Sequence, residues 1–284
     1  MFPPVVTKDP TAVDMEVQAT YLALFPGGDS LFVSRVFGWA IECFLGHYAD
    51  YQPIDARYHD FEHTLQGTLC LSRLLHARQR TGAQPAVTEH FFQLTIIAVL
   101  LHDTGYLKKR DDKQGTGAKY TATHVHRSAE FAAHLLTEKG FGISDITAVQ
   151  NMIRCTGIDA VLSEISFQSE LEKLCGQALA TADLLGQMSA DDYVDKLPIL
   201  YAEFAEAAKH DRAHTDFISK FGDAEDLVQH TPGFWHDYVL PKFNRDLGNL
   251  HRFLNDPYPD GPNEYVQRIE TNMVRIQRES DAKG

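Results

Sequence analysis

Apolar residues recur at helical spacing along almost the whole chain, and this periodicity constrains the fold more than any other feature. In residues 32–45 and 65–75 the apolar side chains are three and four positions apart, as on one face of a helix. No convincing alternation of apolar and polar residues indicates a strand. With 284 residues, 44% of them hydrophobic, the chain can bury a large core. The sequence predicts an all-α protein.

Helix start and stop signals divide the rest of the chain. Gly140 and Gly157 are expected to end two helices, and Pro198 is expected to kink or divide another. After His210 the chain turns polar. Residues 107–122 form a long non-periodic connection, and such a loop is more often functional or mobile than idle. Further helices are expected over residues 88–101, 123–139, 144–155, 170–188, 190–209, 234–254 and 263–278.

Charge and composition exclude several classes of protein. Lys and Arg total 26 and Asp and Glu 39, a net charge of −13 that disfavours nucleic acid polymers and acidic membranes as partners. The four cysteines form no CxxC pair, so we expect reduced core thiols, neither disulfides nor a thiolate zinc site. No signal peptide or apolar run long enough for a bilayer is visible. The expectation is a cytoplasmic protein with no membrane partner; its oligomeric state stays open.

Ionisable residues in apolar contexts mark a candidate site. His102 and Asp103 end the apolar helix QLTIIAVLL, and Asp183 lies within ALATADLL. Such groups are costly to desolvate without a partner, and a divalent ion would accept them together. His59 and His63 are four residues apart and share one helical face. Taken singly, each feature also fits an ordinary helix cap or a solvated face.

The order of these residues resembles the H…HD…D signature of the HD-domain metal-dependent phosphohydrolases. His63, His102-Asp103 and Asp183 match the signature in turn. YHDFEH over residues 58–63 resembles the YHNxxH segment of cyclic-nucleotide phosphodiesterases, and residues 124–132 resemble the HxxxSAxxA helix of many relatives. The resemblance covers about residues 57–188. It implies an HD-type helical bundle there. Because no Pro/Gly/Ser-rich linker divides the chain, we expect one domain over residues 1–284, with N-terminal helices over 12–48 and a C-terminal helical extension over 190–284 added to the bundle.

The resemblance also implies roles for individual residues. His59 is the candidate general acid, and Asp103 is a catalytic ligand able to bridge to a second metal. His124 faces a second metal or the substrate phosphate. The ligands implied for a divalent ion (Mn, Mg, Fe, Co, Ni or Zn) are His63, His102, Asp103 and Asp183. The substrate implied is a small phosphoester, a nucleotide or cyclic nucleotide.

Two basic residues are further candidates for substrate binding. Lys108 follows the HD pair, and Arg127 lies one turn after His124 on the same predicted helix face. As alternatives to substrate binding, Lys108 could lie in a solvated turn and Arg127 could form a surface salt bridge. We interpret His236-Asp237, a second HD pair after a polar stretch, as surface or lid.

The sequence departs from two-metal relatives at two places. Tyr106 stands where phosphodiesterases carry a second-site histidine, and residues 152–156 lack the further histidine of HD-type di-iron oxygenases. The sequence therefore predicts one complete metal site. A di-iron oxygenase and a non-catalytic, metal-stabilised regulatory module remain alternatives to the phosphohydrolase.

Overall fold

The computed structural model describes residues 2, 4–210 and 220–282. Within these ranges the chain is helical, and its only β-type pairings are two isolated bridges, Tyr51 with Lys109 and Asn255 with Asn263. The predicted all-α class is confirmed. In the described part of the chain, no helix combines the length and the apolar character needed to span a bilayer. The four cysteines are free and buried, as expected.

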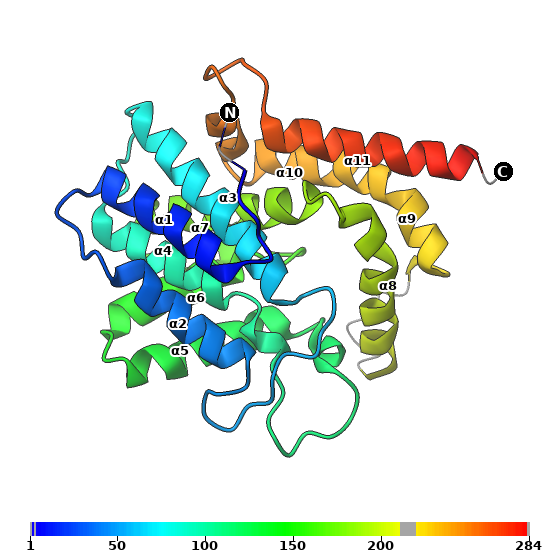
Figure 1. Cartoon of the computed structure of the whole chain (residues 1–284), viewed down its shortest axis with the longest axis horizontal. Coiled ribbons are helices and arrows are strands. Elements are labelled where there is room, and N and C mark those ends of the chain that lie inside the picture. Colours follow the sequence, from blue (N-terminus) through cyan, green and yellow to red (C-terminus); the bar gives the residue numbers. More distant parts are fainter. Residues whose placement is uncertain (1, 3, 211–219, 283–284) are drawn as a thin grey trace.

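Five helices form the centre of the bundle (Figure 1). The apolar helix α4 packs against α3, α6 and α7, and its residues from Leu94 to Leu101 are all buried. Asp60 caps α3 by accepting the backbone N–H of His63, so the first turn that carries this histidine is fixed. The helices are α3 (Phe61–Arg80), α4 (Glu89–Leu101), α5 (His124–Glu138), α6 (Ile143–Arg154) and α7 (Glu170–Met188).

Gly186 lets α3 and α7 run side by side. A Cβ added to Gly186 would lie 2.7 Å from the carbonyl oxygen of Gln66 and 2.8 Å from the nitrogen of Gly67. The two backbones therefore touch where a larger residue would separate them. Because α3 carries His63 and α7 carries Asp183, this contact sets how closely the two side chains approach.

The N-terminal helices cover one side of this centre. Helix α1 (Pro10–Leu24) packs against α3, and α2 (Phe32–Phe44) packs against α1 and α4. Their buried side chains join the main hydrophobic core. These helices agree with the prediction for residues 12–48. Gly140, at a φ of 82°, follows α5 as the predicted stop.

The C-terminal extension differs from the prediction in two places. Of the two outcomes expected at Pro198, a kink or a division of the helix, division does not occur, since α8 is one helix over Tyr193–His210. Helix α9 (Ala224–Gly233) occupies part of the stretch described as polar. Residues 234–254 are not one helix: a π-helical turn (Phe234–Val239), α10 (Leu240–Arg245) and the 3-10 helix η6 (Leu250–Leu254) replace it. Gly248 and Asn249, both at positive φ, lie between α10 and η6 and end the helical run there.

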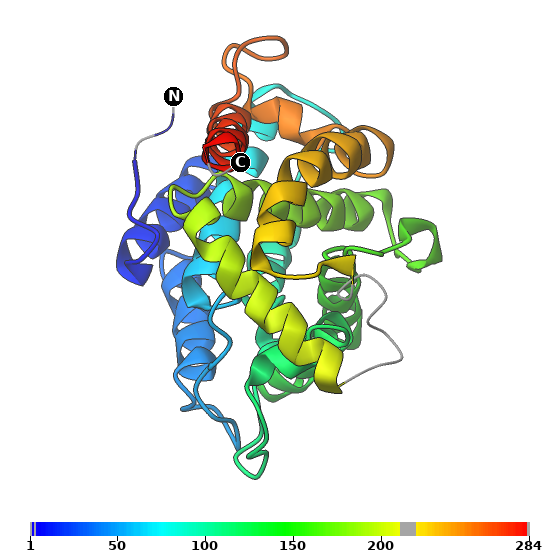
Figure 2. The same cartoon turned by 90° about the vertical axis from the view of Figure 1, so that its right-hand side faces the viewer.

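The extension closes onto the bundle. Helix α8 packs against α9, η6 packs against α3 and α7, and α11 (Glu264–Asp281) packs against α7, α8 and α9. Figure 2 shows α8 crossing the face of the molecule turned to the viewer. The loop over residues 107–122 is not structureless, because the 3-10 helix η2 (Gly117–Tyr120) forms within it and contacts α8.

Candidate metal centre

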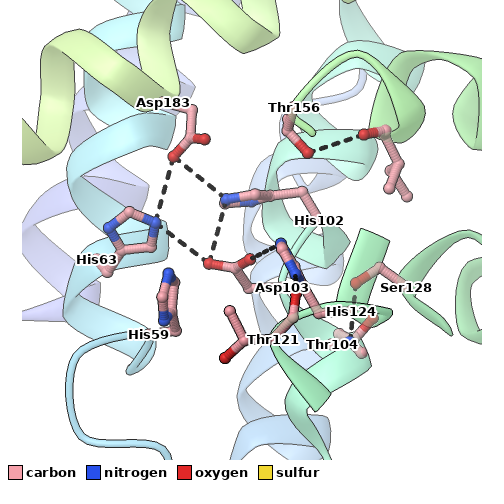
Figure 3. Close-up of polar contacts among 12 residues, drawn as sticks. His59, His63, His102, Asp103, Thr104, Thr121, His124, Ser128, Thr156 and Asp183 are labelled. Atoms are coloured by element: carbon pink, nitrogen blue, oxygen red, sulfur yellow. Dashed lines mark hydrogen bonds and ion pairs between the residues drawn. The ribbon is translucent and has the colours of Figure 1, made fainter. Parts of the chain in front are cut away.

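Four side chains from three helices converge in the bundle (Figure 3). His63 Nε2 lies 3.2 Å from Asp103 Oδ2 and 3.2 Å from Asp183 Oδ1. His102 Nε2 lies 3.3 Å from the same Asp103 oxygen and 3.4 Å from the same Asp183 oxygen. His102 is the C-cap of α4, and Asp103 follows it directly. The structure thus brings together all four predicted ligands, which we call the quartet.

The quartet fits a divalent ion chemically. Its residues are between 1% and 8% exposed, and the buried atoms His102 Nε2 and Asp103 Oδ2 have no partner besides the approaches of 3.2–3.4 Å within the quartet itself. Buried polar atoms normally have partners, since leaving one unsatisfied costs about 1–3 kcal/mol. His102 Nδ1 lies 2.7 Å from the carbonyl oxygen of Val99, so it donates its proton there and leaves a lone pair on Nε2. Imidazole nitrogens and carboxylate oxygens suit borderline divalent ions.

Protons occupy the quartet when no ion does. Burial lowers the pKa of His63, but hydrogen bonds to Asp103 and Asp183 and their negative charge raise it to about 10. Burial likewise lowers the pKa of His102, but the charges of the two carboxylates raise it to about 9. Burial favours neutral carboxyls, yet the charges of the two histidines hold both carboxyl pKa values below their usual range. The two carboxylates thus demand positive charge, from protons or from a cation.

His59 lies beside the quartet and has a carboxylate partner. Its Nδ1 is 2.6 Å from Glu203 Oε2, and its ring centroid is 5.4 Å from that of His63. Glu203 Oε1 accepts the backbone N–H groups of Arg57 and Tyr58, at 2.6 and 2.8 Å. This carboxylate holds both the segment before α3 and the ring of His59. Glu203 is not among the residues predicted from the sequence; the one sequence signal for it is an acidic residue on the apolar side of a periodic helix.

His124 faces the quartet from the start of α5. Its Nδ1 lies 2.6 Å from the carbonyl oxygen of Thr121, and its Nε2 lies 3.8 Å from Asp103 Oδ1. Burial lowers its pKa, which favours a neutral ring that donates from Nδ1 and keeps a lone pair on Nε2. Tyr106 is fully buried between His59 and His124. Its ring centroid lies 4.4 Å from that of His59 and 4.7 Å from that of His124.

Comparison with known families places the chain. The sequence model of the Npun_R2479-like family matches residues 13–256, which include most of α1, the quartet, α8 and η6. The chain belongs to the Npun_R2479-like family. No curated protein matches it. The match extends on both sides of residues 57–188, so the N-terminal helices and α8 are part of what defines an Npun_R2479-like chain.

The two basic residues predicted to bind substrate have other partners in this Npun_R2479-like protein. The Arg127 guanidinium donates to the carbonyl oxygens of Gly105 and Leu107, at 2.7 and 2.9 Å, and lies 3.5 Å from the ring centroid of Tyr120. Lys108 Nζ is buried and lies 2.6 Å from the carbonyl oxygen of Gly115 and 2.7 Å from Asp55 Oδ2. Both cations thus bind backbone carbonyl oxygens in the segment that follows the HD pair, and Lys108 also pairs with Asp55, which precedes α3.

The second HD pair of this Npun_R2479-like chain does not join the centre. His236 is about half exposed, and its Nε2 lies 3.7 Å from Glu270 Oε2. Within the described ranges, the one group of at least three potential ligands with atoms close enough to share an ion is His63, His102 and Asp103, against which Asp183 lies. The surface interpretation of His236 is confirmed.

Proposed function

We propose that this protein is a metal-dependent hydrolase that cleaves a phosphoester, with the quartet as its metal site. The observation that supports this proposal most is the buried quartet itself. In it, His102 Nε2 and Asp103 Oδ2 have no partner outside the quartet, and the two carboxylates require positive charge. The ligand order His63, His102-Asp103, Asp183 matches that of the HD-domain phosphohydrolases. The ion is Mn, Mg, Fe, Co, Ni or Zn, and the substrate class we propose is a nucleotide or cyclic nucleotide.

The chain supplies the other groups that such hydrolysis needs. A divalent ion bound in such a centre lowers the pKa of water and polarises a phosphoryl oxygen. Glu203 fixes the orientation of the His59 ring through Nδ1, so that Nε2 holds the proton for the departing oxygen. His124, neutral and donating from Nδ1 to the backbone, presents its Nε2 toward Asp103. Asp103 therefore faces the two histidine ligands through Oδ2 and His124, the histidine expected to face the phosphate, through Oδ1.

Elemental analysis combined with a hydrolysis assay tests this proposal. Purified protein is expected to contain about one divalent ion per chain and to hydrolyse bis(p-nitrophenyl) phosphate or p-nitrophenyl phosphate when supplied with Mn²⁺ or Mg²⁺. Asp103→Ala should lose both the ion and the hydrolysis. His236→Ala is the matched control, since it removes the histidine of the other HD pair at an exposed position.

Other results would point to the alternative functions. Two irons per chain without hydrolysis would favour the oxygenase. A tightly held ion without hydrolysis of either ester would favour the regulatory module. Protein without any metal, even after purification and incubation with each candidate ion, would refute the proposal.

A further inference from the structure

Helix α8 carries two carboxylates one turn apart, one bound to a histidine beside the quartet and the other bound to the loop over residues 107–122. Glu203 binds His59, as described above. Glu206 lies three residues further along α8 and therefore on the same face of the helix. Its Oε1 accepts the backbone N–H of Thr116 at 2.5 Å, and its Oε2 accepts the hydroxyl of the same residue at 2.8 Å. Both oxygens of Glu206 are thus committed to one residue of the loop after the HD pair.

The loop is shaped to receive this carboxylate. Gly115 has a φ of 56°, which favours glycine, and a Cβ there would lie 2.5 Å from Glu206 Oε1. A Cβ on Gly117 would lie 2.1 Å from the carbonyl oxygen of Tyr106. The segment Gly115–Thr116–Gly117 therefore fits between α8 and the backbone that follows Asp103 only because it carries two glycines.

The same segment leads to His124. Thr116 is the N-cap of η2, where its hydroxyl also accepts the N–H of Ala118 at 3.2 Å. Thr121, the C-cap of η2, donates its own N–H to Ala118 and offers its carbonyl oxygen to His124 Nδ1, at 2.6 Å. The acceptor that orients His124 is thus the C-cap of a short helix whose N-cap, Thr116, is held by Glu206 and whose first residue, Gly117, donates its N–H to Asp55 Oδ1 at 2.7 Å.

We propose that Glu206 is a positioning residue for His124, acting through Thr116 and η2. It makes no contact with the quartet. It holds Thr116 at the start of η2, and η2 in turn places the Thr121 carbonyl oxygen. That oxygen accepts from Nδ1 of His124 and so orients the ring, whose Nε2 faces Asp103. Helix α8, outside the segment that resembles HD proteins, then orients both histidines that flank the quartet. The importance of Glu206 for turnover rests on the proposed hydrolase function; the orientation of His124 does not.

Four variants and one control test the role. Glu206→Ala removes both acceptors, whereas Glu206→Gln can still accept the Thr116 N–H and donate to its hydroxyl. Thr116→Val removes the hydroxyl at similar size, whereas Thr116→Ser keeps it. Lys209→Ala is the control, at an exposed position one turn after Glu206 on α8. If Glu206→Ala fails to fold, the comparison of Thr116→Val with Thr116→Ser tests the positioning role instead.

The first readout needs no activity. ¹⁵N-histidine NMR reports which ring nitrogen of His124 carries the proton, with the signal assigned by its loss in His124→Gln. Wild type, Glu206→Gln, Thr116→Ser and Lys209→Ala should show the proton on Nδ1. Glu206→Ala and Thr116→Val should show mixed tautomers. An unchanged His124 signal in Glu206→Ala and Thr116→Val would overturn the positioning role, whether or not the protein hydrolyses any phosphoester.

The second readout is steady-state kinetics on bis(p-nitrophenyl) phosphate. We expect Glu206→Ala to lower kcat about tenfold with KM and metal content nearly unchanged, since residues behind a first layer of functional groups typically contribute tenfold or more. Glu206→Gln should retain most of the rate. A loss of bound metal in Glu206→Ala, with the His124 tautomer intact, would show a purely structural role and refute the proposal.

Discussion

The contact between α3 and α7 predicts opposite effects for two similar substitutions. An alanine Cβ at position 186 would lie 2.7 Å from the Gln66 carbonyl oxygen and 2.8 Å from the Gly67 nitrogen, both of them backbone atoms. At position 67 the nearest atoms would be Asp183 Cα at 3.6 Å and a Val99 methyl at 3.7 Å, which is ordinary contact. Gly67 lies inside α3 and Gly186 in the last turn of α7, so alanine gains at most about 1 kcal/mol of helix propensity at either position. The main difference between the two substitutions is the clash.

The size of the clash sets the expected magnitudes. Carbon and oxygen atoms normally approach to about 3.4 Å, so Gly186→Ala must move the helices apart by roughly 0.7 Å. Overpacking of this kind costs about 1–3 kcal/mol. Gly186→Ala should therefore be less stable than Gly67→Ala by that amount, a Tm difference on the order of 5 °C. The same movement lengthens the 3.2 Å approach of His63 to Asp183, so metal affinity should fall about ten- to a hundredfold.

Thermal unfolding of the metal-free proteins and titration of each with Mn²⁺ measure both effects. Gly67→Ala is expected to be at least as stable as the wild type and to bind the ion with similar affinity. If Gly186→Ala matches Gly67→Ala in both Tm and metal affinity, then close packing of these two helices does not set the geometry of the quartet.

Three further predictions concern the histidines. His59→Ala should keep its metal but lose at least about a hundredfold in turnover; unchanged turnover would exclude His59 as the general acid. Metal-free protein should lose stability as the pH rises from about 6.5 toward 10, because folding raises the pKa of His63 and the folded state keeps a proton that the unfolded chain has released. Measuring Tm against pH in EDTA tests this prediction. A Tm that stays level between pH 6.5 and 10 would contradict it. Burial lowers the pKa of His251 to about 4, so stability should also fall from pH 6.5 to 4, by roughly 1–2 kcal/mol after allowing for its partial exposure, and His251→Phe should remove that loss in acid unfolding curves.

Three of the four metal ligands could be predicted from sequence because they lie in apolar contexts. His102 and Asp103 follow an apolar helix, and Asp183 interrupts another apolar run. Ionisable groups in such places need partners, and two such places in one chain favour a common partner. His63 lies in the polar segment YHDFEH and is predicted from its place in the H…HD…D order.

The supporting residues could not be predicted in the same way. Glu203 lies some 140 positions after His59, and α8 presents it only because the C-terminal extension folds back across the bundle. Arg127 has the spacing of a phosphate ligand, but sequence spacing does not reveal the backbone carbonyl oxygens of Gly105 and Leu107 that it binds. The error over residues 234–254 has a local cause, since apolar spacing there continues across Gly248 and Asn249, whose positive φ ends the helix.

These two kinds of residue imply that the functional unit is larger than the segment carrying the metal ligands. Residues 57–188 contain the whole quartet, His59 and His124. They lack Glu203, which binds His59, and Glu206, which binds the start of η2. The family match over residues 13–256 includes both carboxylates. On our proposal, an ion held by the quartet alone would be flanked by a His59 without its carboxylate partner and by a His124 whose acceptor, Thr121, follows an η2 without its Glu206 contact, and α8 is the element that orders both histidines.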